Sequence, residues 1–165
     1  MTRISALLIF SIVILGIVCP AVAQNYTIDT YDFRWEIGRA GKTALYVQKT
    51  QIGVGAILSS PGGRLGSINL TPSQAKAVGD LLLKTDDYYA EFQAKTMESG
   101  KTVPAGDVFV TFSSKRKGAN FKVAAHPEKI IKNAVLFNRE EALKMGKLLQ
   151  DIEARAAFAD KRIQP

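Results

Sequence analysis

The chain has 165 residues, a formal net charge of +7, one cysteine and one histidine. A single cysteine excludes a disulfide framework within the chain, and a single histidine leaves no complete Cys/His ligand set for zinc. The length suits one domain with its own hydrophobic core.

The first segment has the three parts of a secretory signal. Arg3 supplies the positive start, residues 4–18 are apolar or small, and Ala21-Val22-Ala23 has the small-x-small pattern of a cleavage site. We therefore expect a signal peptide over residues 1–23, cleaved after Ala23, and export to the periplasm or the medium. An uncleaved N-terminal membrane anchor and a lipoprotein attached through Cys19 are the two alternatives.

We expect the mature region, residues 24–165, to form a single domain. Its first half has the pattern of a meander of strands. Glycine-rich punctuation at residues 38–41 and 61–63 separates apolar runs rich in β-forming residues. The predicted strands are residues 33–37, 43–49, 54–59 and 65–70. The stretch 36–43 ends in Gly-Lys-Thr like a phosphate-binding loop, but it begins with Glu36 and leads into a strand, so we interpret it as a hairpin turn.

In each half of the chain the predicted strands are followed by a helix start, and the two starts have similar sequences. Residues 70–82 read LTPSQAKAVGDLL and residues 137–149 read FNREEALKMGKLL. Thr71 and Asn138 each stand three residues before a Gln or Glu, which is the pattern of a capping box. Apolar residues then recur at helical spacing, so each segment is predicted to be an amphipathic helix.

The second half repeats the plan of the first. Strands are predicted at residues 108–113, 121–125 and 134–137, with a fourth near Lys101 to Val103. The fold class is therefore predicted to be α+β: two pseudo-repeats, residues 33–93 and 101–158, each an antiparallel meander of three or four strands followed by one amphipathic helix.

Matching glycines occur inside the two predicted helices. Glycine in a helix interior costs about 1 kcal/mol relative to alanine, so its presence at both Gly79 and Gly146 calls for a reason. We expect the two helices to approach each other closely near a pseudo-twofold axis, with chance recurrence as the alternative.

The strand-to-helix joint carries a resemblance. Residues 68–74, Ile-Asn-Leu-Thr-Pro-Ser-Gln, after several strands, resemble the module of the whirly proteins and the positive-cofactor transcriptional coactivators, and the PUR-repeat proteins are similar in plan. The resemblance covers about residues 33–158. It implies paired modules whose sheet surfaces bind single-stranded nucleic acid, although those families work inside cells or organelles.

Basic residues concentrate in the second half. Residues 24–100 carry eight basic and eight acidic residues, whereas residues 101–165 carry thirteen and seven. Such a surplus is typical of proteins that bind nucleic acid or another polyanion. The alternative is that these charges only solvate a hairpin. The candidate polyanion-binding residues are Lys115, Arg116, Lys117, Lys122, Lys129 and Lys132.

Other chemistry is sparse. Tyr46 is the best candidate for an outward aromatic side chain on which a base could stack. His126 has no second histidine or cysteine to join it, and the adjacent carboxylate pairs 86–87 and 140–141 point apart on their helices. We therefore expect no enzyme, no metal and no cofactor.

Taken together, the sequence predicts an exported, non-catalytic binding module with a basic second half that binds nucleic acid or another polyanion. The alternative function is an envelope scaffold or protein–protein interaction subunit, in which another envelope protein is the partner.

Overall fold

A computed structural model describes residues 30–60, 66–127 and 133–163 of the chain. The predicted signal peptide lies outside these residues. So do Lys129 and Lys132.

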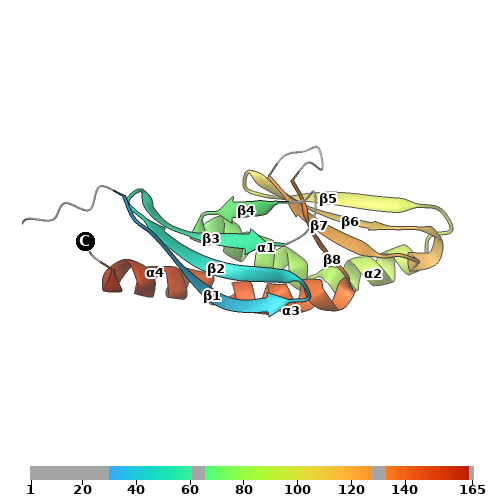
Figure 1. Cartoon of the computed structure of the whole chain (residues 1–165). Coiled ribbons are helices and arrows are strands. Elements are labelled where there is room, and N and C mark those ends of the chain that lie inside the picture. The colour runs from blue at the N-terminus through green and yellow to red at the C-terminus, as the bar shows by residue number, and fades with distance from the viewer. Residues whose placement is uncertain (1–29, 61–65, 128–132, 164–165) are drawn as a thin grey trace, which may run out of the picture.

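Two antiparallel sheets of four strands each make up the β part of the fold, and both are simple meanders (Figure 1). The first sheet contains β1 (Asp32–Ala40), β2 (Thr43–Thr50), β3 (Gly53–Ser59) and β4 (Ser67–Leu70). The second contains β5 (Ser99–Ala105), β6 (Val108–Ser114), β7 (Lys122–His126) and β8 (Val135–Phe137). The predicted α+β class with two meanders is confirmed, and β5 is the fourth strand expected near Lys101.

Helical segments follow each sheet, and both begin at the predicted capping boxes. The Gln74 backbone N–H donates to Thr71 Oγ1 at 3.2 Å, and the Thr71 N–H donates back to Gln74 Oε1 at 2.9 Å. Asn138 and Glu141 make the equivalent pair of bonds, both at 2.9 Å. These bonds satisfy amides that a helix start otherwise leaves without partners.

Each predicted helix is divided in two. The first segment consists of α1 (Pro72–Leu83) and α2 (Thr85–Gln93), and the second of α3 (Arg139–Leu149) and α4 (Ile152–Arg162). At the first break the buried Thr85 hydroxyl donates to the Leu82 carbonyl at 2.6 Å. This side-chain hydrogen bond satisfies a carbonyl at the end of α1. Apolar periodicity continues through both breaks, so the sequence pattern did not reveal them.

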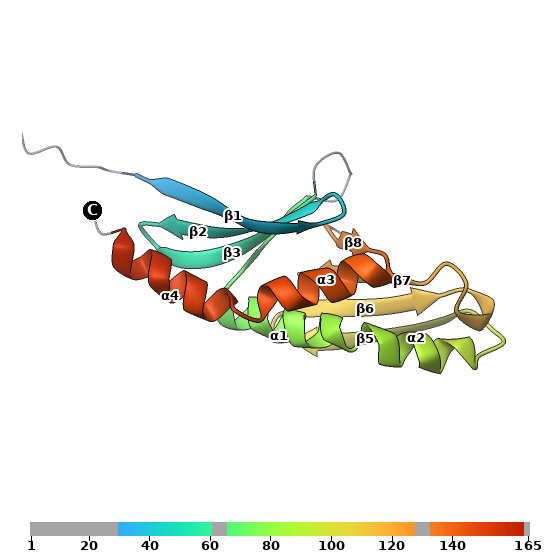
Figure 2. The same cartoon turned by 90° about the horizontal axis from the view of Figure 1, so that it is seen from below.

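The outer helices are exchanged between the two halves. The helices lie on one side of both sheets (Figures 1 and 2). α2, which follows the first sheet, packs on β6 of the second, whereas α4, which follows the second sheet, packs on β2 and β3 of the first. α1 and α3 cross at the centre and contact strands of both sheets. One hydrophobic core therefore runs through both repeats.

The central crossing depends on the two matching glycines, as predicted. A Cβ atom on Gly79 would lie 2.7 Å from Leu149 Cβ and 3.3 Å from the Gly146 carbonyl oxygen. A Cβ atom on Gly146 would lie 3.1 Å from the Gly79 carbonyl oxygen. Each glycine thus makes room for the backbone of the other helix, and the contacts are reciprocal.

Alanine at either glycine should destabilise the protein, although alanine is the better helix former. For Gly79→Ala we expect a loss of about 2 kcal/mol in the free energy of unfolding, because the cost of overpacking exceeds the gain in helix propensity. Gly146→Ala should lose less, since its closest contacts are longer. Chemical denaturation measures both. Gly66→Ala is the control, because a Cβ there meets no atom within 4 Å; stabilisation by Gly79→Ala would contradict the close approach.

A polar contact joins α1 to the end of α3 beside this crossing. Gln150 Nε2 donates to Asp80 Oδ1 at 3.1 Å, and Lys76 Nζ lies 2.9 Å from Asp80 Oδ2. The hydrogen bond from Lys76, followed by that from Gln150, lowers the pKa of the Asp80 carboxyl below its ordinary value.

A lowered pKa predicts how this contact responds to acid. Because the ionised form is favoured in the folded state, the contribution of Asp80 to stability should be complete above its unfolded-state pKa and lost as the pH falls through the folded-state pKa. Carboxyl titration by NMR should find the Asp80 pKa below that of an ordinary aspartate. It should rise toward the ordinary value in Gln150→Leu, and an unchanged value there would show that Gln150 contributes nothing.

Candidate functional site

The described basic residues of the predicted site lie together in one turn. Lys115, Arg116 and Lys117 form the connection between β6 and β7, and Lys122 is the first residue of β7. We call residues 115–122 the basic turn. It lies at one end of the molecule, beside α2 and far from α4 (Figure 1).

The basic turn has a defined backbone. Its ends are tied by the Lys115 N–H, which donates to the Ala119 carbonyl at 2.7 Å. Lys117, Gly118 and Asn120 all have left-handed φ values, of 55°, 74° and 53°. This conformation costs a non-glycine residue about 1 kcal/mol, so Lys117 is held against its own preference.

Contacts with α2 hold the turn in place. The Lys117 N–H donates to the Lys95 carbonyl at 2.9 Å, just beyond the end of α2. Gly118 is buried against the same helix, where an added Cβ would lie 2.9 Å from Gln93 Cγ. The turn is therefore ordered by the fold and does not depend on a ligand for its shape.

The four cations of the turn are exposed and unneutralised. Among the residues that the structure describes, none of Lys115, Arg116, Lys117 and Lys122 forms an ion pair. The nearby Lys95 and Lys101 both face Glu91, at 2.7 and 3.9 Å. The hydrogen bond from Lys95 lowers the pKa of Glu91. The Glu91 carboxylate therefore stays ionised and neutralises Lys95 and Lys101, not the cations of the turn.

A small hollow opens between the cations. Lys115, Lys122, Asn120 and Glu98 line it, together with two serines, Ser113 and Ser114, and its volume is about 340 Å³. Ser114 is only 3% exposed, and its hydroxyl has no hydrogen-bond partner in the described part of the chain. A buried hydroxyl without a partner is costly, and because this oxygen is closed off from solvent the cost belongs to the fold itself.

The structure does not bring Tyr46 to the basic turn. Tyr46 lies on β2, on the face of the first sheet turned away from the helices, so its predicted outward position is confirmed. Its neighbours there are Glu36 and Arg39. Two hydrogen bonds from Arg39 lower the pKa of Glu36, with a smaller contribution from the Tyr46 hydroxyl.

Two aromatic side chains do lie at the basic turn, Phe121 within it and Tyr89 on the adjacent helix α2. Tyr89 and Phe121 meet edge to face at 5.3 Å, and the Arg139 guanidinium lies 4.3 Å from the centre of the Tyr89 ring. These three residues border a hollow of about 600 Å³ that also touches Gly118. Arg139 is itself paired with Asp86 at 2.6 Å. Only the exchange of α2 onto the second sheet brings Tyr89 here.

Two other motifs are resolved by the structure. Residues 36–43 form the β1–β2 hairpin, with Gly41 at φ 58°, so the interpretation as a turn is confirmed. His126 is completely buried at the end of β7, where Nε2 lies 2.9 Å from Thr111 Oγ1, itself 2.8 Å from Thr102 Oγ1. Nothing in the sequence pattern indicated this hydroxyl chain.

Within the described ranges no cluster of three or more His, Cys, Asp or Glu side chains could hold a metal ion, and none of the helices there is long and apolar enough to cross a membrane. No protein-family model matches the chain, and no curated protein matches it. The site therefore has to be interpreted from its own geometry.

Replacing Lys117 by glycine should separate stability from binding. Glycine adopts the left-handed conformation without the side-chain penalty, so Lys117→Gly should be more stable than the natural protein by about 0.5–1 kcal/mol in denaturant unfolding. It should also elute from a heparin column at lower salt, because it loses a cation. Lys117→Ala is the control: it loses the same charge but keeps the strain. Destabilisation by Lys117→Gly would show that the lysine side chain itself supports the turn.

Proposed function

We propose that this protein is an exported, non-catalytic binding module that holds a polyanion, such as a single-stranded nucleic acid, on the basic turn. The observation that carries the proposal is the set of four exposed cations on an ordered turn, none of them neutralised by a described residue. Glu91, a carboxylate on α2 whose pKa is lowered, is already paired with Lys95 and Lys101.

The chemistry of the turn suits a phosphate or sulfate backbone. Lysine and arginine contacts to such groups supply most of the sequence-independent affinity of nucleic-acid-binding proteins, through release of counterions. Ser113 and Asn120 line the same hollow as Lys115 and Lys122 and add neutral polar side chains to it. Phe121 within the turn and Tyr89 beside it offer ring surfaces for a base.

Salt dependence tests the proposal most directly. Binding of a fluorescent single-stranded oligonucleotide should weaken steeply with salt, with a slope of about −0.7 for each phosphate contact in the plot of log affinity against log salt. The triple variant Lys115→Gln, Arg116→Gln, Lys117→Gln should bind at least tenfold more weakly at moderate salt, and its slope should be shallower by about two.

A matched control separates the basic turn from overall charge. The triple variant Lys84→Gln, Lys144→Gln, Lys147→Gln removes the same charge from exposed helical positions away from the turn. It should retain most of the affinity. Equal losses in the two triple variants would show that only net charge matters, and unchanged binding in the turn variant would overturn the proposal.

A second candidate function is an envelope scaffold, and one observation favours it. β1 is an outer strand of the first sheet, and it exposes Phe33 and Trp35, whose rings stack 6.2 Å apart. An outer strand with exposed aromatic residues can pair with another chain. β5, an outer strand of the second sheet, contains Pro104, which has no backbone N–H to donate to another strand. β5 is therefore less suited to pairing with another chain. A stable oligomer that survives moderate salt would favour the scaffold.

A further inference from the structure

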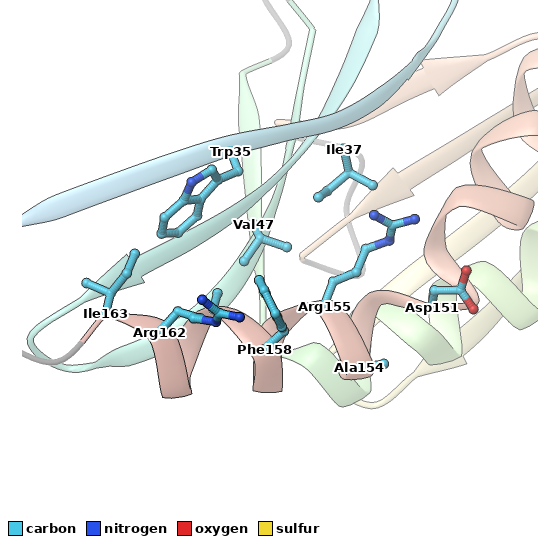
Figure 3. A pocket seen from close by; sticks show the side chains of 10 residues that line it. Trp35, Ile37, Val47, Asp151, Ala154, Arg155, Phe158, Arg162 and Ile163 are labelled. Carbon is cyan, nitrogen blue, oxygen red and sulfur yellow. The ribbon is translucent and has the colours of Figure 1, made fainter.

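An apolar groove lies at the end of the molecule opposite the basic turn. It runs between the strands β1 and β2 and the helix α4, and its volume is about 740 Å³ (Figure 3). This volume lies within the range of small-molecule sites. Its principal walls are Trp35, Ile37, Val47, Arg155, Phe158 and Ala159.

The pseudo-repeat explains why this space is open. Strand register and helix position pair each groove residue with one in the second sheet, where aromatic side chains fill the same space. There Tyr88 stacks on Phe112 with ring centres 4.1 Å apart, and Phe92 is buried beside them. In the first sheet the replacements are Val47 for Phe112, Arg155 for Tyr88 and Ala159 for Phe92. Three rings that fill the second sheet's packing are thus absent here, while Trp35 and Phe158 stand where the second half has Lys101 and Glu91.

The walls that remain are apolar and reachable from solvent. Trp35 is 37% exposed and Phe158 is 61% exposed, and the two rings face the groove from opposite sides (Figure 3). Exposed large apolar side chains gathered around one groove mark a binding surface. The helical wall extends from Asp151 to Ile163, a distance of about 18 Å at the rise of an α-helix. The site is therefore long enough for an extended chain.

The charges at the rim favour an anionic end on that chain. Arg155 and Arg162 line the groove, and neither forms an ion pair with any residue in the part of the chain that the structure describes. The Arg162 guanidinium lies over the Phe158 ring at 5.1 Å. Asp151 is the carboxylate that lines the groove, one turn from Arg155, and Asp160 is paired with Lys49.

We propose that this groove binds a single-chain alkyl carboxylate, with the chain between Trp35 and Phe158 and the carboxylate on Arg155. One arginine fork matches one carboxylate with two parallel hydrogen bonds. The neighbouring Asp151 disfavours a head group with more than one negative charge. This site is separate from the basic turn and lies at the opposite end of the molecule. The proposal therefore does not depend on polyanion binding.

Trp35 is the only tryptophan in the chain, so the protein carries its own reporter. Tryptophan emission of the purified protein should shift to the blue when sodium dodecanoate is added below its micelle-forming concentration. Across decanoate, undecanoate and dodecanoate the affinity should rise about fourfold for each added methylene. Dodecyltrimethylammonium, which has the same chain and the opposite charge, should bind at least tenfold more weakly than dodecanoate.

Two pairs of variants locate the site. Arg155→Gln should weaken dodecanoate binding about tenfold but leave binding of neutral decanol unchanged, whereas Lys161→Gln, on the same helix but outside the groove, should bind both as before. Ala154→Glu puts a carboxylate into the groove and should abolish the shift. Ala157→Glu adds the same charge at an exposed position of α4 outside the groove and should not.

Ala154 and Ala157 are both exposed, so neither change should unfold the protein, and circular dichroism checks this. The proposal is overturned if dodecanoate produces no shift, if Ala154→Glu responds like the natural protein, or if dodecyltrimethylammonium binds equally well. It is also overturned if the emission depends on protein concentration without amphiphile and sizing finds a dimer. In that case a second copy occupies the groove.

Discussion

The close approach of α1 and α3 at Gly79 and Gly146 is the constraint on which the rest of the structure depends. A Cβ atom added at either glycine would lie about 3 Å from the other helix, so there is no room for a side chain at either position and the two backbones approach each other closely. This crossing sends α2 beneath the second sheet and α4 beneath the first. Both proposed sites follow from that exchange, because α2 supports the basic turn and α4 forms one wall of the groove.

The two ends of the molecule use the same framework for different chemistry. At one end the space between helix and sheet is filled by Tyr88, Phe92 and Phe112, and the surface carries exposed cations on a backbone that is already ordered. At the other end the aromatic residues sit on the rim, at Trp35 and Phe158, and the interior is left open. Differences in side-chain volume at equivalent positions, on an unchanged backbone plan, account for the contrast.

Much of the fold could be predicted from the sequence because its signals are local. The capping boxes at Thr71 and Asn138, the turn glycines and the repeated helix pattern each depend on neighbouring residues. The exchange of helices could not be predicted, since the same amphipathic face suits either sheet. The basic turn could be predicted because its charges are consecutive in the sequence, whereas the position of Tyr89 and the groove depend on contacts between distant segments.

The exchanged helices also have a genetic consequence. Two separate copies of one such unit could associate in the same way as a homodimer. Both copies would then be encoded by one gene, so a mutation would change both ends of the dimer at once. Joining the copies in one chain removes that restriction, since each half mutates alone. Val47 and Phe112 can then differ while Gly79 and Gly146, which both halves need, stay alike. Covalent fusion thus permits asymmetric specialisation of an otherwise symmetric architecture.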